Sequence, residues 1–279
     1  MGASSSKKSE ALEEAESCYS PDDLQRIQDA FLRFSQGKTP DGVPMLTCAE
    51  LQALLQKNSG LVRNIFNVMS EGSEKGITMD QFLEAKVTCE RSSKARANAF
   101  LYRLFDTQNR GKIDRHAVEK VLFLCVEYVK GTSEDTDETL VNACLNAAFE
   151  KVKQNTTSED LTLTEFQTWT NAVPAVTNLL LNLLKSQEMG AVDVSPIRPE
   201  LNCGSVEPTL TVIGATHAWL LAGMLQEHQR CSWTLLYNSR THGTSISTFV
   251  GRCTARGPAL LVIRDTTGGV FGGFAAEPW

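Results

Sequence analysis

The residues at the N-terminus have the types and spacing that enzymatic acylation requires. Gly2 follows the initiator methionine, a serine stands at position 6, and Lys7 and Lys8 come directly after it. This pattern is typical of N-myristoylation, in which removal of Met1 frees the amine of Gly2 for the fatty acid. A serine-rich segment that fits the pattern by chance is the alternative. Residues 1–20 are therefore expected to be a disordered, myristoylated segment, although one acyl chain gives only reversible membrane binding.

A second possible chemistry is cation binding by the loop over residues 106–117. Asp106, Gln108 and Asp114 supply side-chain oxygens at its first, third and ninth positions. The loop resembles an EF-hand, whose calcium ligands lie at positions 1, 3, 5, 7 and 9, with a bidentate glutamate at position 12. Here Arg110 occupies the fifth position and Ala117 the twelfth. The sequence predicts that the loop keeps its shape and loses its calcium site, so no cofactor is expected.

Similar sequences recur along residues 21–185, where apolar residues follow helical spacing. Residues 154–165 keep an acid at the twelfth position, Glu165, but have none at the first, third or fifth. Two further units end in helices that begin just after Leu46 and Ile77. Four such units predict two paired EF-hand-like lobes, and a generic helical bundle is the alternative. Without calcium, a helical scaffold of this kind still has apolar grooves suited to a partner helix.

Composition excludes several classes of function. The 279 residues are 42% hydrophobic and 22% charged, with a formal net charge of −6, which gives no basic footprint for nucleic acid. No apolar run reaches the roughly 18 residues needed to span a bilayer, and the first residues lack a secretory signal. The eight cysteines are scattered without a C-x-x-C pair, as expected of reduced thiols in the cytoplasm. No small-molecule substrate is expected either.

An enzyme would need a nucleophile and a base with assigned roles. His242 and Cys253 are the nearest to such a pair, but no spacing in the sequence is diagnostic of zinc or of a catalytic dyad. Each has a simpler interpretation, because His242 stands beside a glycine turn and Cys253 lies on an apolar helical face. The sequence predicts a protein without catalysis.

The elements of the last third differ from those before. Residues 186–208 are rich in proline and glycine and are predicted to form a linker. A helix is expected from about residue 216 and a strand over residues 232–237. A second helix is expected from about residue 244 until glycine and proline stop it at positions 257 and 258. Strands over residues 259–263 and 270–275 are predicted to form a hairpin.

The residues of this last third resemble the TLDc domain family of oxidation-resistance proteins. The matching positions run in order and at the family's spacing, and about ten carry the likeness: Trp233, His242, Gly243, Phe249, Gly257, Pro258, Asp265, Gly272, Gly273 and Trp279. The resemblance runs from Trp233 to Trp279, within a partial TLDc domain expected over residues 209–279, and implies an α+β chain. An all-α EF-hand-like region would be followed by the incomplete first part of a TLDc β-sandwich.

The resemblance also implies a function. The order of acylation motif, EF-hand-like region and TLDc segment is similar to a branch that includes plant-type proteins and an animal lysosomal member associated with mTOR. It implies a non-enzymatic regulator, peripheral on the cytosolic face of a lysosome or vacuole, with the V-ATPase among its protein partners and a role in oxidative stress. A calcium-myristoyl switch is the competing class. Because the expected sandwich is roughly twice as long, we expect a truncated product, a short isoform, or a partner that supplies strands.

Overall fold

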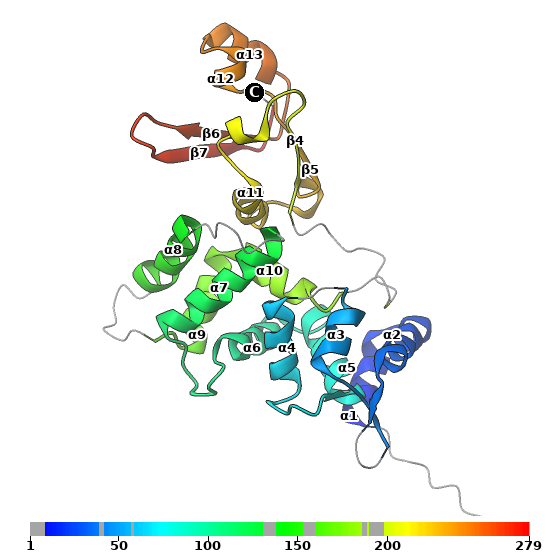
Figure 1. Cartoon of the computed structure of the whole chain (residues 1–279). Helices are drawn as coiled ribbons and strands as arrows, with labels where there is room; N and C mark the ends of the chain where they lie inside the picture. The colour runs from blue at the N-terminus through cyan, green and yellow to red at the C-terminus, as the bar shows by residue number, and fades with distance from the viewer. Residues whose placement is uncertain are drawn as a thin grey trace, which may run out of the picture. The chain divides into compact units, whose positions relative to one another are not determined.

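The computed structural model describes residues 9–38, 42–56, 59–130, 138–152, 160–185, 189 and 198–278. The chain divides into two compact units, Met1–Ser195 and Pro196–Trp279 (Figure 1). The first is helical with a few short strands, and the second mixes short helices with strands, which confirms the α+β class. Gly2 and Trp279 lie outside the described residues.

Helices dominate the first unit. Those described are α1 (Glu10–Cys18), α2 (Pro21–Phe34), α3 (Cys48–Leu54), α4 (Gly60–Met69), α5 (Met79–Glu90), α6 (Lys94–Phe105), α7 (Arg115–Lys130), α8 (Glu138–Asn146) with the π-helical turn η1 (Ala147–Lys151), α9 (Leu163–Ala172) and α10 (Pro174–Asn182). Most begin at a serine or threonine whose hydroxyl accepts a hydrogen bond from the third following N–H. Such caps satisfy N–H groups that have no partner inside the helix, so the sequence itself sets where these helices start.

The N-terminal segment differs from its expected disorder over residues 10–18, which form α1. Ala15 is fully buried there, and Glu14 pairs with the guanidinium of Arg96 on α6. The Tyr19 hydroxyl, just beyond α1, donates to Glu90 on α5 at 2.8 Å. These partners are about 70 to 80 residues away in sequence, so a reading of the local composition does not find them.

Short strands join the loops of the first unit in pairs. β1 (Gly37–Lys38), β2 (Pro44–Leu46) and β3 (Ile77–Thr78) form one antiparallel sheet in that order. Leu46 pairs with Ile77, and farther along the chain Ile113 pairs with Leu161 in an isolated antiparallel bridge. Leu46, Ile77 and Leu161 directly precede the N-cap of an exiting helix, and Ile113 lies two residues before α7. The geometry is that of two loop pairs.

Each loop pair lies on its own aromatic core. In the first, the rings of Phe31 and Phe82 lie 5.5 Å apart. In the second, the ring centroid of Phe166 is 5.0 Å from that of Phe105 and 5.5 Å from that of Trp169. Phe105 and Trp169 also meet edge to face at 5.6 Å. Edge-to-face rings add to the stabilisation that burial of their area provides.

The second unit contains shorter elements. Those described are β4 (Glu200–Asn202), the 3-10 turn η3 (Pro208–Leu210), α11 (Ala215–Ala222), the 3-10 turn η4 (Glu227–Gln229), β5 (Ser232–Thr234), α12 (Ser239–His242), α13 (Ile246–Cys253), β6 (Ala259–Arg264) and β7 (Val270–Ala275). β4 pairs with β5 in parallel, and β6 pairs with β7 as an antiparallel hairpin in continuous register.

Several boundaries in the second unit differ from the predicted ones. Residues 200–202, placed in the linker by their composition, form β4 because β5 supplies a partner for their backbone. β5 ends at Thr234 rather than at residue 237, and α13 follows Ser245 as its N-cap rather than residue 244. No helix of the described residues is long and apolar enough to cross a membrane.

Candidate functional site

The bridge between Ile113 and Leu161 joins two loops at corresponding positions. Each residue is the eighth of its twelve-residue loop, and the two exchange both backbone hydrogen bonds, at 3.0 and 2.7 Å. The Tyr102 hydroxyl lies 2.9 Å from the carbonyl oxygens of both Gly111 and Leu161. The first six positions of the second loop, residues 154–159, lie outside the described residues. The two loops are thus held together at their exits.

The carboxylates of the first loop already have partners. The two oxygens of Asp106 accept the N–H groups of Arg110 and Gly111, at 2.9 and 2.7 Å. Asp114 accepts the N–H of Ala117 at 2.8 Å and a guanidinium hydrogen of Arg110 at 2.6 Å. The hydrogen bond from Ala117 and the charge of Arg110 lower the pKa of the Asp114 carboxyl. Gln108 is exposed. The guanidinium of Arg110 is therefore the positive charge that pairs with the Asp114 carboxylate in this loop.

Glu165 faces the start of its own helix. Its Oε2 accepts hydrogen bonds from the N–H and the hydroxyl of Thr162, both at 2.8 Å, in a capping box. Glu50 repeats this arrangement with Thr47 in the other lobe. Burial opposes ionisation of Glu50, but N–H hydrogen bonds from Thr47 and Gln36 outweigh it and lower its pKa. In these positions the acids stabilise helix starts.

We expect the native chain to give no calcium-dependent heat at micromolar calcium. Arg110 pairs with the Asp114 carboxylate, and Ala117 offers no side-chain oxygen at the twelfth position. The double variant Arg110→Asp, Ala117→Glu should create measurable calcium binding, because it restores three carboxylate oxygens to the loop. Titration calorimetry of the full chain measures both, with Arg115→Asp, Lys120→Gln as a control that changes the charge by the same three units at exposed positions. Micromolar binding by the native chain would instead support the calcium-myristoyl switch.

The sequence did not predict two polar interactions that connect distant segments of this lobe. Lys112 reaches Asp160 across the two loops at 2.6 Å, and the Trp169 indole N–H donates to the carbonyl of Cys144 at 3.2 Å. The recurrent Thr-x-x-Glu capping signature was readable at Thr47 and Thr162. The partners of Lys112 and Trp169 depend on how distant segments pack, and no local signal gives them.

In the second unit, a first group of signature residues surrounds a tight turn. The Trp233 indole on β5 donates to the Gln229 carbonyl at 2.8 Å. His242 ends α12, where its Nδ1 accepts the N–H of Asn238 at 3.0 Å. Gly243 follows with a φ of 79°, and the Tyr237 hydroxyl donates to its carbonyl. A side chain at this φ would be strained, so glycine fits the turn.

The contacts that the described structure gives His242 are with Asn238 and Tyr237, not with Cys253. The His242 ring lies 5.9 Å from the ring of Tyr237, which in turn meets Phe249 on α13 edge to face at 5.2 Å. Cys253 is buried, and burial raises the pKa of its thiol. A raised thiol pKa leaves little thiolate at neutral pH, which disfavours nucleophilic attack.

A second group of signature residues shapes the β6–β7 hairpin. Asp265 Oδ1 accepts the hydroxyl and N–H of Thr267, at 2.8 and 2.9 Å, and the N–H of Gly269 at 2.8 Å. These hydrogen bonds, that of the hydroxyl first, lower the pKa of Asp265. A Cβ at Gly257, before Pro258, would lie 2.8 Å from the Cα of Pro278. A Cβ at Gly272 would lie 2.1 Å from the Leu261 carbonyl oxygen, whereas Gly273 has open space. Asp265 therefore stabilises the turn of the hairpin, and Gly257 and Gly272 allow close backbone contacts.

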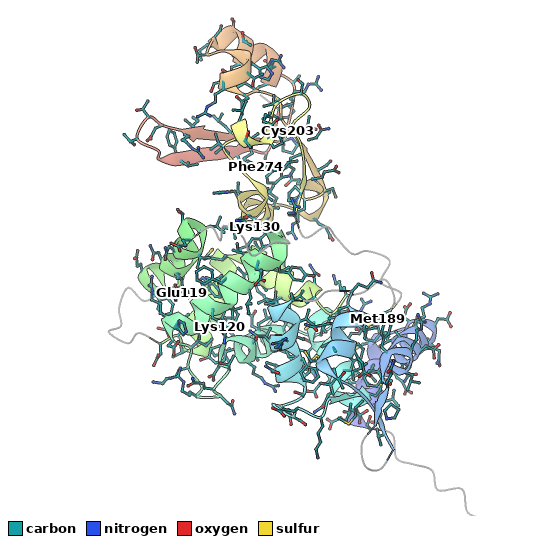
Figure 2. The ribbon with its side chains drawn as sticks, in the orientation of Figure 1. Glu119, Lys120, Lys130, Met189, Cys203 and Phe274 are labelled. Carbon is teal, nitrogen blue, oxygen red and sulfur yellow. The ribbon has the colours of Figure 1, made fainter. Side chains whose placement is uncertain are left out.

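The hairpin also presents apolar side chains to solvent. Val270, Phe271 and Phe274 on β7 are 52%, 58% and 45% exposed, and Figure 2 labels Phe274 on this hairpin. Ile246 and Val250 on α13 are exposed as well. Among the described residues, no group of three or more histidines, cysteines or acids is placed to hold a metal ion. The hairpin and α13 each carry exposed apolar side chains.

Comparison with known families identifies the segment that contains these residues. Residues 209–279, about a quarter of the chain, match the family model described as the TLDc domain. This part of the chain is similar to the TLDc family, as its signature residues predicted.

Two kinds of curated relative share this similarity. The chain is 37% identical over 59 residues to the MTOR-associated protein MEAK7 of Danio rerio and 32% identical over 89 residues to that of Homo sapiens. It is 28% identical over 107 residues to Oxidation resistance protein 1 of Bos taurus. These alignments cover 21%, 32% and 36% of this chain, but only 13%, 20% and 12% of the relatives. The chain thus matches a small part of each relative.

Proposed function

We propose that this chain is a non-enzymatic regulatory protein that binds protein partners through its TLDc segment. The observation that carries the proposal is the match of residues 209–279 to the TLDc domain, together with the roles of its signature residues. They cap a helix, close turns and allow strands to approach, and none forms a nucleophile–base pair. The exposed apolar residues of β7 supply a surface of the kind that protein interfaces cover.

The relatives indicate which partners to test. Since MEAK7 is named for its association with mTOR, we propose that this chain acts in mTOR-type signalling, and the family resemblance adds the V-ATPase and resistance to oxidative stress. The helical unit would then serve as a scaffold, its paired loops held closed by Arg110, Lys112 and the capping acids rather than by calcium.

Immunoprecipitation of the tagged full chain, with blots for mTOR and for V-ATPase subunits, tests the partner proposal. We expect at least one of them to co-precipitate with the native chain and to be lost with Phe271→Ser, Phe274→Ser. Leu32→Ser changes an equally exposed apolar residue of α2 and should leave binding intact. Circular dichroism checks that the variants fold. Binding that survives the double substitution, or no binding by the native chain, contradicts the proposal.

We also propose that Gly2 is myristoylated and holds the chain reversibly at the cytosolic face of a lysosome or vacuole. Gly2→Ala removes the glycine that N-myristoylation requires at position 2. We therefore expect this variant to abolish incorporation of an alkyne-tagged myristate and to shift the chain from the membrane to the supernatant fraction. Ala3→Gly, which leaves Gly2 in place, is the control. Equal labelling of the native chain and Gly2→Ala would show that this glycine is not the site.

A further inference from the structure

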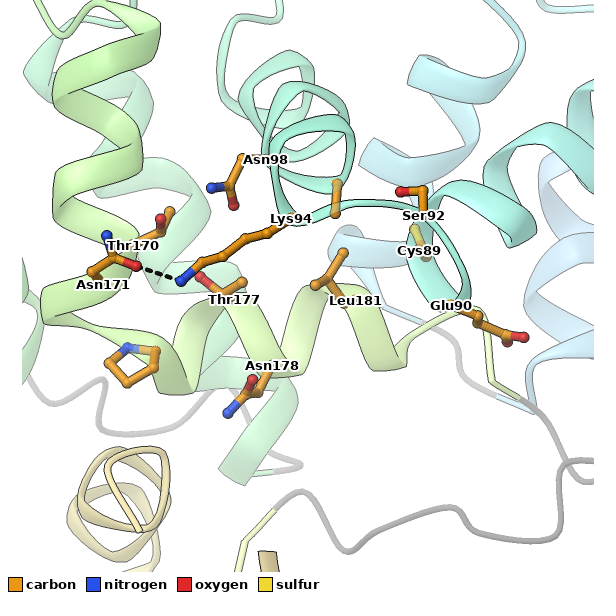
Figure 3. A pocket seen from close by; sticks show the side chains of 12 residues that line it. Cys89, Glu90, Ser92, Lys94, Asn98, Thr170, Asn171, Thr177, Asn178 and Leu181 are labelled. Atoms are coloured by element: carbon orange, nitrogen blue, oxygen red, sulfur yellow. Dashed lines mark hydrogen bonds between the residues drawn. The ribbon is translucent and has the colours of Figure 1, made fainter. Parts of the chain in front are cut away.

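A hollow of about 410 Å³ opens in the first unit where α5 and α9 end and α6 and α10 begin (Figure 3). Lys94 and Asn98 line it from the first turns of α6, and Thr170 from the end of α9. Thr177 and Leu181 lie four residues apart on α10 and so share the face of that helix that borders the hollow. None of its lining residues belongs to the paired loops or to the TLDc segment.

Two polar atoms at this hollow lack hydrogen-bond partners among the described residues. They are Oδ1 of Asn98, a residue that is only 4% exposed, and the hydroxyl of Thr177. The nearby Thr170 hydroxyl is already used, because it donates to the Gln167 carbonyl at 2.9 Å. Buried polar groups are nearly always hydrogen-bonded, and leaving one unpaired is costly. The arrangement is therefore suited to a molecule that donates a hydrogen bond to Asn98.

The hollow also contains a cation without a carboxylate partner in the described structure. Figure 3 shows the Lys94 side chain extending toward Asn171, whose neutral amide oxygen accepts its ammonium at 2.6 Å. The acid among the lining residues, Glu90, is already engaged by Lys86 at 2.6 Å and by the Tyr19 hydroxyl at 2.8 Å. Burial raises the pKa of the Cys89 thiol to about 12, so this group is neutral at physiological pH.

The partial charges at the helix ends do not change the net charge around the hollow. Two helices begin and two end around the hollow, so their partial charges oppose one another. Lys94 remains the cation of the lining that has a neutral partner, so a negative group is favoured beside its ammonium. Ala97, Pro174 and Leu181 supply apolar lining.

We propose that this hollow binds a small carboxylate that also carries a hydroxyl or amino group on the neighbouring carbon. Its carboxylate would pair with Lys94, its O–H or N–H would donate to Asn98 Oδ1, and Thr177 would complete the hydrogen bonding. The carbon skeleton would contact Leu181. A volume of about 410 Å³ falls in the range of small-molecule pockets. The ligand is bound rather than transformed, and the proposal is independent of the partner-binding function.

Calorimetry and thermal unfolding of the full chain test the ligand class with four matched probes. They are L-valine, 2-hydroxy-3-methylbutanoate, 3-methylbutanoate, which lacks the donor, and 2-methylpropylamine, which lacks the carboxylate. We expect valine or its hydroxy analogue to bind and to raise Tm, and the two truncated probes to bind about tenfold more weakly or less. Failure of all four at millimolar concentration, or equal binding of all four, overturns the proposal.

Two substitutions separate binding from folding. Asn98→Leu removes the acceptor at similar volume, so binding should weaken about tenfold or more while Tm stays equal or rises. Lys94→Gln should weaken the carboxylate probes and leave 2-methylpropylamine unaffected. Asn64→Leu is the control, because the amide of Asn64 is also unpartnered and lies outside the hollow. Undiminished binding by Asn98→Leu would mean that the probes do not use Asn98 as their acceptor, which overturns the proposal.

Discussion

Replacing Phe166 by alanine is expected to lower the free energy of unfolding of the helical unit by about 3–5 kcal/mol, as for other buried phenylalanines. Phe166 is fully buried on α9 and touches the rings of Tyr102, Phe105 and Trp169. The substitution removes a ring from the centre of this cluster, and its neighbours cannot all move to fill the space. Urea unfolding followed by near-ultraviolet circular dichroism measures the loss, since Trp169 reports on the same cluster.

Phe166→Ala should also destabilise the paired loops. Phe166 lies five residues after Leu161, whose backbone pairs with Ile113, so loosening the start of α9 should raise amide exchange at both residues of the bridge. Leu163→Ala is the matched control, because Leu163 lies on the same helix but is 39% exposed. We expect it to cost less than about 1 kcal/mol. Equal losses for the two variants would mean that the aromatic cluster does not hold the lobe together.

Part of this architecture was predictable because its causes are local. The Thr-x-x-Glu pattern at Thr47 and Thr162 set the starts of α3 and α9, through hydrogen bonds within one helical turn. The strands at residues 259–263 and 270–275 were predicted within one residue, since apolar runs around a glycine turn leave few alternatives. The contacts of Asp106 and Asp114 with Arg110 are equally local, because these residues lie within one loop.

Other features depend on distant segments and were not predictable. α1 is held by Arg96 and by the Tyr19–Glu90 hydrogen bond, neither of which its own composition reveals. β4 exists because β5 pairs with it, although residues 200–202 have the composition of a linker. The hollow beside Asn98 requires four helix ends to meet. In the sequence Asn98 is one polar residue in an amphipathic helix, and only the packed structure shows that its Oδ1 is buried without a partner.

The β6–β7 hairpin gives the second large prediction, which distinguishes two adjacent glycines. We expect Gly272→Ala to destabilise the TLDc unit by about 2–3 kcal/mol, in the upper range for overpacked sites. An added Cβ at Gly272 would lie 2.1 Å from the Leu261 carbonyl oxygen and 3.2 Å from the Cα of Val262. These are backbone atoms of the paired strand, so relief requires the strands to separate. Amide exchange over residues 259–264 should rise accordingly.

Gly273→Ala should have the opposite effect on the stability of the TLDc unit. An added Cβ there meets no atom within 4 Å, and replacing a strand glycine by alanine reduces the conformational entropy lost on folding. We expect a stabilisation of about 0.5 kcal/mol, with exchange over residues 259–264 unchanged or slower. Because the partner proposal relies on the same hairpin, Gly272→Ala should also lose co-precipitation while Gly273→Ala keeps it. If both variants lose stability equally, the cause is the loss of glycine in β7 and not the contact with Leu261, and the close approach of the strands has no structural role.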